Sequence, residues 1–81
     1  MSTVYIAPHR TLDCSGLACP MPILKTKKAL DALQAGHILK MISTDPGSVS
    51  DMEAFARKTG NHLIEVERDD NNKYIFYIRK S

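Results

Sequence analysis

The chain has 81 residues, of which 43% are hydrophobic and 25% are charged, with a formal net charge of +2. This length predicts one small domain over residues 1–81, the composition excludes a disordered or fibrous protein, and the low charge argues against direct binding of nucleic acid. No apolar run approaches ~20 residues and no signal-peptide pattern opens the chain, so we expect a cytoplasmic protein without membrane contact.

The first half of the chain predicts a strand, a helix and a second strand. A tail over residues 1–9 leads into a strand over residues 10–14, and a helix then begins near Pro20 and ends at Gly36. A strand over residues 37–44 follows. Along the helix, inward-facing residues recur at three- and four-residue steps, namely Ile23, Thr26, Leu30 and Leu33.

The second half predicts a helix and a β-hairpin. Asp45-Pro46 opens the helix with a capping residue followed by a proline in the first turn, and Gly60-Asn61 ends it. Residues 62–68 and 73–80 alternate as strands do, and the polar turn 69–72 joins them. The order β-α-β-α-β-β predicts an α/β (α+β) two-layer sandwich, with two helices on one face of a four-stranded mixed sheet. The predicted inward face of the second helix is Val49, Met52 and Ala56, flanked by Phe55.

Cys19 stands directly before two closely spaced prolines, Pro20 and Pro22. Prolines break a helix interior, but they are tolerated in the first turn, where the N–H groups lack an intrahelical partner. This predicts Pro20 near N1, Pro22 near N3 and Cys19 at the N-cap. A sulfur there faces the positive end of the helix dipole, which favours the thiolate and lowers a cysteine pKa below its usual ~8.5. Met21 is the expected N–H donor to the sulfur.

Other interpretations of Cys19 stay open on these grounds. A cysteine at a helix start is often only a small, partly buried residue. Two cysteines are too few for a typical disulfide-stabilised secreted scaffold, so at least one thiol is expected to be kept for reactivity. The local chemistry fits a redox thiol, a sulfur carrier or a metal ligand.

Longer segments around this cysteine narrow the choice. Leu12-Asp13, Gly16-Leu17 and Cys19-Pro20-Met21-Pro22, the run 24–30 and Asp45-Pro46 resemble the TusA/SirA/YedF-like sulfur-carrier family over nearly the whole chain. The resemblance implies a two-layer α/β sandwich and a sulfurtransferase-type carrier that holds a covalent persulfide on Cys19, with no separate cofactor. It also implies two protein partners, a sulfur donor such as a cysteine desulfurase or rhodanese-like protein, and a sulfur acceptor. In this family the carried sulfur serves tRNA thiolation, cofactor sulfuration or the oxidation of reduced sulfur, and some relatives are associated with selenium metabolism.

The residues around Cys19 carry further expectations. Asp13 is expected to satisfy backbone groups in the turn at Gly16. Cys14 is either a possible resolving thiol, which would attack a Cys19 persulfide and leave a disulfide, or a strand residue packed under the first helix. We favour the packed residue. On a helical wheel Met21, Leu24 and Lys28 lie opposite the inward face. The exposed apolar residues predict a docking patch for a partner, with Lys27 and Lys28 attracting acidic groups, against the alternative of chance exposure.

Two rival functions remain at this level. One is a thiol–disulfide redox or regulatory protein that uses Cys14 and Cys19. The other is a binding module for RNA or protein without covalent chemistry, because the element order also resembles the C-terminal domain of a bacterial translation initiation factor. No metal site is expected, because the histidines His9, His37 and His62 are scattered and lack metal-ligand spacing. A carrier that docks with two partners in turn is most simply a monomer.

Overall fold

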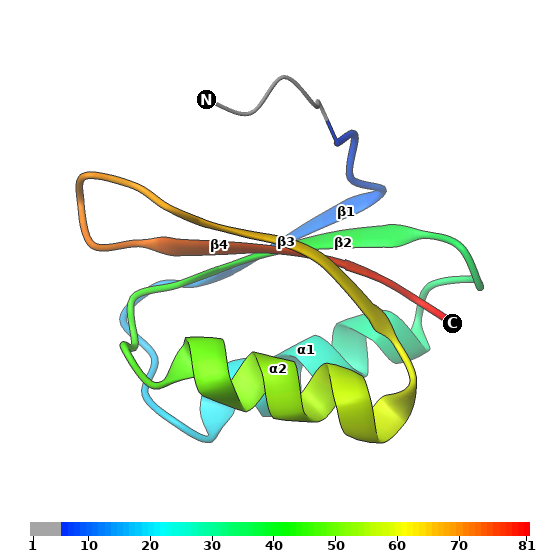
Figure 1. Ribbon diagram of the computed structural model, residues 1–81, viewed down its shortest axis with the longest axis horizontal. Coiled ribbons are helices and arrows are strands. Elements are labelled where there is room, and N and C mark those ends of the chain that lie inside the picture. Colours follow the sequence, from blue (N-terminus) through cyan, green and yellow to red (C-terminus); the bar gives the residue numbers. More distant parts are fainter. Residues whose placement is uncertain (1–5) are drawn as a thin grey trace.

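The computed structural model describes residues 6–81, and the first five residues of the predicted tail lie outside this range. Figure 1 shows two helices packed on one face of a four-stranded sheet, which confirms the predicted fold class. The elements are β1 (Arg10–Cys14), α1 (Met21–Asp31), β2 (Ile38–Ser43), α2 (Ser48–Thr59), β3 (His62–Arg68) and β4 (Tyr74–Arg79). Within residues 6–81, neither helix is long and apolar enough to cross a membrane.

The sheet has the strand order β1-β2-β4-β3 and is mixed. β1 and β2 are parallel, whereas β4 pairs antiparallel with both β2 and β3. Because β1 and β2 run in the same direction, the loops that follow them leave the sheet at the same end, where both strands have their carboxyl ends. Both helices therefore start at the same end of the molecule, on the left in Figure 1. This topology brings the start of α1 close to the start of α2.

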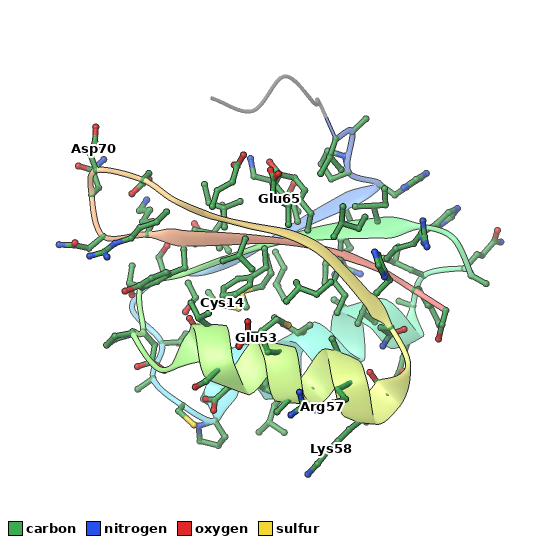
Figure 2. The ribbon with its side chains drawn as sticks, in the orientation of Figure 1. Cys14, Glu53, Arg57, Lys58, Glu65 and Asp70 are labelled. Atoms are coloured by element: carbon green, nitrogen blue, oxygen red, sulfur yellow. The ribbon has the colours of Figure 1, made fainter. Side chains whose placement is uncertain are left out.

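The core fills the space between the sheet and the two helices, as the sticks in Figure 2 show. Side chains on β2 alternate between half-buried and buried, as expected for a strand with one face on the core. Phe76 on β4 pairs with Met41 on β2, and both are fully buried. The buried hydrophobic residues come from five elements: Cys14, Ala29, Leu30, Leu39, Met41, Met52, Ala56, Phe76 and Ile78.

The end of α1 differs from the prediction. The helix stops at Asp31, well before Gly36. The N–H groups of Ala32 and Leu33 donate to the carbonyls of Ala29 and Leu30, three residues back, and these bonds tighten and finish the last turn. Gly36, with φ +90°, belongs instead to the turn before β2, where its N–H donates to the Lys80 carbonyl.

The start of α2 also differs from the prediction, whereas its end is confirmed. Asp45 is not the N-cap, because its carbonyl accepts bonds from both the N–H and the hydroxyl of Ser48 and so closes a turn ahead of the helix. Gly47 is the N-cap and provides no side-chain cap. At the other end Gly60 adopts the left-handed conformation with φ +76°, as a helix-terminating glycine does.

Candidate functional site

Cys19 lies exposed in the loop between β1 and α1, one residue earlier relative to the helix than predicted. Pro20 is the N-cap, because its carbonyl accepts the first helical bond, from the Leu24 N–H at 3.1 Å. Met21 is then N1 and Pro22 is N2. The Cys19–Pro20 peptide bond is cis. The prolines do occupy the helix start, but the sulfur precedes the cap.

The predicted electrostatics of Cys19 were wrong in two respects. The N–H of Met21 does not serve the sulfur, because it donates to the Ala18 carbonyl at 3.0 Å. The pKa of Cys19 is raised above its ordinary value rather than lowered. The largest cause is a hydrogen bond to the carboxylate of Asp51, followed by partial loss of solvent and by the negative charges of Asp51 and Asp45. A nearby carboxylate therefore disfavours the thiolate of Cys19.

Asp51 comes from the first turns of α2 and was missed by the sequence analysis. It belongs to a cavity of about 300 Å³ between the start of α1 and one side of α2. The side chains that line this cavity are Cys19, Pro20 and Ile23 from the α1 side and Asp51, Ala54, Phe55 and Lys58 from α2. The signal that finds Asp51 is topological, because two parallel strands followed by helices bring those helix starts together.

Cys14 is a core residue. It is the last residue of β1, has no exposed surface and is not disulfide-bonded. Burial raises the pKa of its thiol, against the opposing charge of Lys25. Figure 2 shows Cys14 between the sheet and the helices. Its position confirms the packed-residue interpretation and gives no support to a resolving thiol.

Hydrogen bonds hold the loop that carries Cys19. The Asp13 carboxylate accepts the Ser15 N–H at 2.9 Å, as predicted, and hydrogen bonding with Ser15 lowers the pKa of Asp13. Gly16 has φ +80°, and its N–H donates to the Thr44 hydroxyl at 2.8 Å. Because Thr44 follows β2, this bond joins the loop before α1 to the loop before α2. Pro22 is fully buried and anchors the first turn of α1 in the core.

The predicted docking residues lie on the outer face of α1. Met21 is 41% exposed and Leu24 is 53% exposed, which places two large apolar side chains in solvent near Cys19. Lys27 and Lys28 are also exposed. Lys27 pairs with Asp31 at 3.3 Å, one helical turn away, so part of its charge is balanced within the helix.

Two of the three histidines are brought together, which their sequence spacing did not indicate. The rings of His9 and His37 stack with centroids 4.2 Å apart and planes 11° apart. Nδ1 of each ring accepts a backbone N–H, from Ile38 for His9 and from Gln34 for His37. Within residues 6–81, no group of three or more His, Cys, Asp or Glu side chains is placed to hold a metal ion. The pair joins the residue before β1 to the start of β2.

Known proteins resemble this chain in sequence and in fold. The model of the family described as Sulfurtransferase TusA matches residues 10–80. The sulfur carrier protein TusA of Allochromatium vinosum is 53% identical over 70 residues, which cover 86% of this chain and 91% of that protein. A putative sulfur carrier protein of Aquifex aeolicus is 46% identical over 94% of this chain, which spans 38% of that longer protein. The crystal structure of a SirA-like protein from Desulfitobacterium hafniense superposes with a TM-score of 0.77 at 27% identity, covering 86% of this chain and 95% of the other.

Proposed function

The chain belongs to the TusA family of sulfurtransferases, and from this premise we propose that it carries sulfane sulfur as a persulfide on Cys19 and relays it to an acceptor protein. The observation that carries the proposal is the contrast between its two cysteines. Cys19 is exposed on a loop at the start of a helix, whereas Cys14 is buried in the core. Only a thiol at the surface can reach the persulfide of another protein without local unfolding.

The chemistry is two thiol exchanges in sequence. The Cys19 thiol loses its proton to solvent, and the thiolate attacks the outer sulfur of a donor persulfide. A new sulfur–sulfur bond forms on Cys19 while the donor's own sulfur–sulfur bond breaks, and the donor cysteine leaves as a thiolate. An acceptor thiolate then attacks the outer sulfur held on Cys19, and Cys19 leaves as a thiolate. The persulfide is cargo, and its transfer requires no separate cofactor.

The protein's contribution is to hold Cys19 at a fixed and accessible position. Pro22 is buried under the first turn of α1 and fixes the helix start. The bonds from Ser15 to Asp13 and from Gly16 to Thr44 fix the loop ahead of it. Both thiols are free, which suits a reducing compartment such as the cytoplasm. Acceptors for such a carrier are proteins of tRNA thiolation, cofactor sulfuration or sulfur oxidation.

The outer face of α1 is our proposed docking surface for the sulfur donor. The docking patch consists of Met21, Leu24, Lys27 and Lys28. Lys28 also lines a cavity of about 330 Å³ together with Lys25 and Arg10. Three basic side chains around one hollow complement acidic side chains on a partner, while Met21 and Leu24 offer apolar contact. A donor with acidic groups beside its persulfide, such as a cysteine desulfurase or rhodanese-like protein, fits this surface.

Intact-protein mass spectrometry without reductant tests the proposed carrier function. The wild type, Cys14→Ser and Cys19→Ser are incubated either with a cysteine desulfurase and cysteine or with polysulfide. We expect a gain of about 32 Da for each sulfur atom added. This gain persists in Cys14→Ser and disappears in Cys19→Ser.

The same assay separates the alternatives. A loss of two hydrogens that requires both cysteines, or no sulfur on Cys19, contradicts the carrier and favours the redox rival. In a Leu24→Glu variant, loading from the desulfurase should slow while loading from polysulfide is unchanged. If Leu24→Glu is loaded by the desulfurase as fast as the wild type is, the docking patch is removed from the proposal and Cys19 remains the carrier residue.

A further inference from the structure

The cavity beside Cys19 contains an acidic side chain that the transfer steps above do not use. Asp51 lines this cavity from α2, opposite Cys19, and its carboxylate raises the pKa of the Cys19 thiol. Its backbone N–H donates to the Gly47 carbonyl within the first turn of the helix. The next residue, Met52, is fully buried in the core. Asp51 is therefore held on a rigid element at a fixed distance from the loop that carries the sulfur.

The charges that face Cys19 oppose the formation of a thiolate. The carboxylate of Asp51 raises the pKa of Cys19 through hydrogen bonding and through its negative charge, and Asp45 adds a second negative charge from the loop before α2. Lys58 lines the same cavity two turns further along α2 and is the cation of this cavity. A thiol can donate its proton to Asp51, whereas a thiolate in the same place would be repelled. The site therefore stabilises the protonated form of Cys19.

We propose that Asp51 is a positioning residue for sulfur transfer, whose carboxylate keeps Cys19 as a thiol directed into the cavity between α1 and α2 while the protein is free. The biological meaning of this inference rests on the proposed carrier function. The thiolate is the form that oxidants and alkylating agents attack. A carrier with an exposed cysteine gains protection from such reactions if the thiolate forms only after docking, when the surroundings of Asp51 change.

The test is the pH dependence of alkylation by iodoacetamide. All proteins carry Cys14→Ser, so that Cys19 is the single thiol. Asp51→Asn removes the negative charge with little change in volume, and Asp51→Glu retains the charge. Glu53→Gln is the matched control, because Glu53 is an exposed acid on the same helix that does not line the cavity. Thermal unfolding of each variant verifies that it is folded.

We expect Asp51→Asn to raise the alkylation rate near neutral pH by at least about threefold, because each unit of pKa changes the thiolate fraction about tenfold below the pKa. The midpoint of the rate profile should move to lower pH. Glu53→Gln should follow the parent profile, and Asp51→Glu should lie closer to the parent than Asp51→Asn does. Asp51→Ala provides a second neutral variant with the same expected direction if Asp51→Asn is unfolded.

The proposal is overturned if the neutral variants have the parent profile or a profile moved to higher pH. It is also overturned if Glu53→Gln moves the profile as much as Asp51→Asn does, because the effect would then be one of net charge. Alkylation needs no sulfur donor, so its outcome is independent of persulfide loading. Loading of Cys19 with an unchanged alkylation profile would remove the role of Asp51 and leave the carrier function intact. A shifted alkylation profile without loading of Cys19 would support the role of Asp51 and contradict the carrier function.

Discussion

Gly16 shows how one backbone conformation supports the loop that carries Cys19. Its φ of +80° lies in the region that only glycine, and to a lesser degree asparagine, adopts at low cost. A Cβ added at this position would meet nothing within 4 Å, so a larger side chain would fit in space. The constraint is therefore conformational, and it secures the bond from the Gly16 N–H to Thr44.

We expect Gly16→Ala to lower the free energy of unfolding by about 1–2 kcal/mol, because an L-residue is strained at this φ. Gly16→Asn should cost less, since asparagine tolerates the left-handed region. Gly47→Ala is the matched control, because Gly47 has φ −78° and an added Cβ would make only an ordinary contact with Asp45. Urea denaturation monitored by circular dichroism measures all three. An alanine at position 16 that costs no more than one at position 47 would contradict the argument.

At the scale of elements, β3 carries a local conflict of charge. Figure 2 shows Glu65 on the face of the sheet away from the helices. The pKa of Glu65 is raised, first by a hydrogen bond with Glu67, then by loss of solvent and by the negative charge of Glu67. Both residues lie on the same strand, two positions apart, so their side chains share a face. When both ionise they repel each other.

The stability of the fold should therefore depend on the protonation of Glu65. The pKa of Glu65 in the folded chain lies above its ordinary value of 4.5. The stabilisation that comes from the protonated side chain is therefore fully present below pH 4.5, and it is lost as the pH rises through the folded-state pKa. We expect Glu65→Gln to raise the melting temperature at pH 7 and to have less effect near pH 4. Asp70→Asn, in the exposed hairpin turn, is the control and should show a smaller change at pH 7. A Glu65→Gln variant that melts at the parent temperature at both pH values would refute this.

The elements themselves could be predicted because their signals are local. The alternation along β3 and β4 and the glycine at the end of α2 depend on neighbouring residues only. The helix boundaries failed where two local patterns competed. Proline is compatible with both the N-cap and the first helical position. Only the bond from the Leu24 N–H to the Pro20 carbonyl shows that Pro20 is the N-cap. Likewise Asp45 has a capping side chain, but its carbonyl closes a turn with Ser48 instead.

At the scale of the whole molecule, the candidate site could be predicted only in part. Cys19 was found from its own neighbours, the two prolines. Asp51 was not, because its contact with Cys19 depends on the order of the strands and on the shared direction of β1 and β2. The electrostatic prediction failed for the same reason: the dipole of α1 is a local property, whereas the opposing carboxylate comes from α2.

The stability of the whole fold is concentrated in the layer between the sheet and the helices. Phe76 is the largest fully buried side chain and sits on a central strand of the sheet. We expect Phe76→Ala to cost about 3–5 kcal/mol through lost burial and a cavity. This is a large part of the 5–15 kcal/mol that stabilises a typical domain. Leu24→Ala, at an exposed position, should cost well under about 1 kcal/mol. Similar losses for both variants in urea denaturation would disprove this location of the core.

The place of β4 in the sheet has a consequence for how the chain matures during synthesis. β4 follows every other element in chain order, yet it lies between β2 and β3 and supplies the pairing partner of both. A nascent chain that has released only residues up to β3 therefore has one unpaired edge on β2, an unpaired β3 and an incomplete apolar layer, which are features that invite association between chains. Folding must wait until β4 has left the ribosome, so the complete sheet that supports Cys19 and Asp51 forms only after the last strand is released.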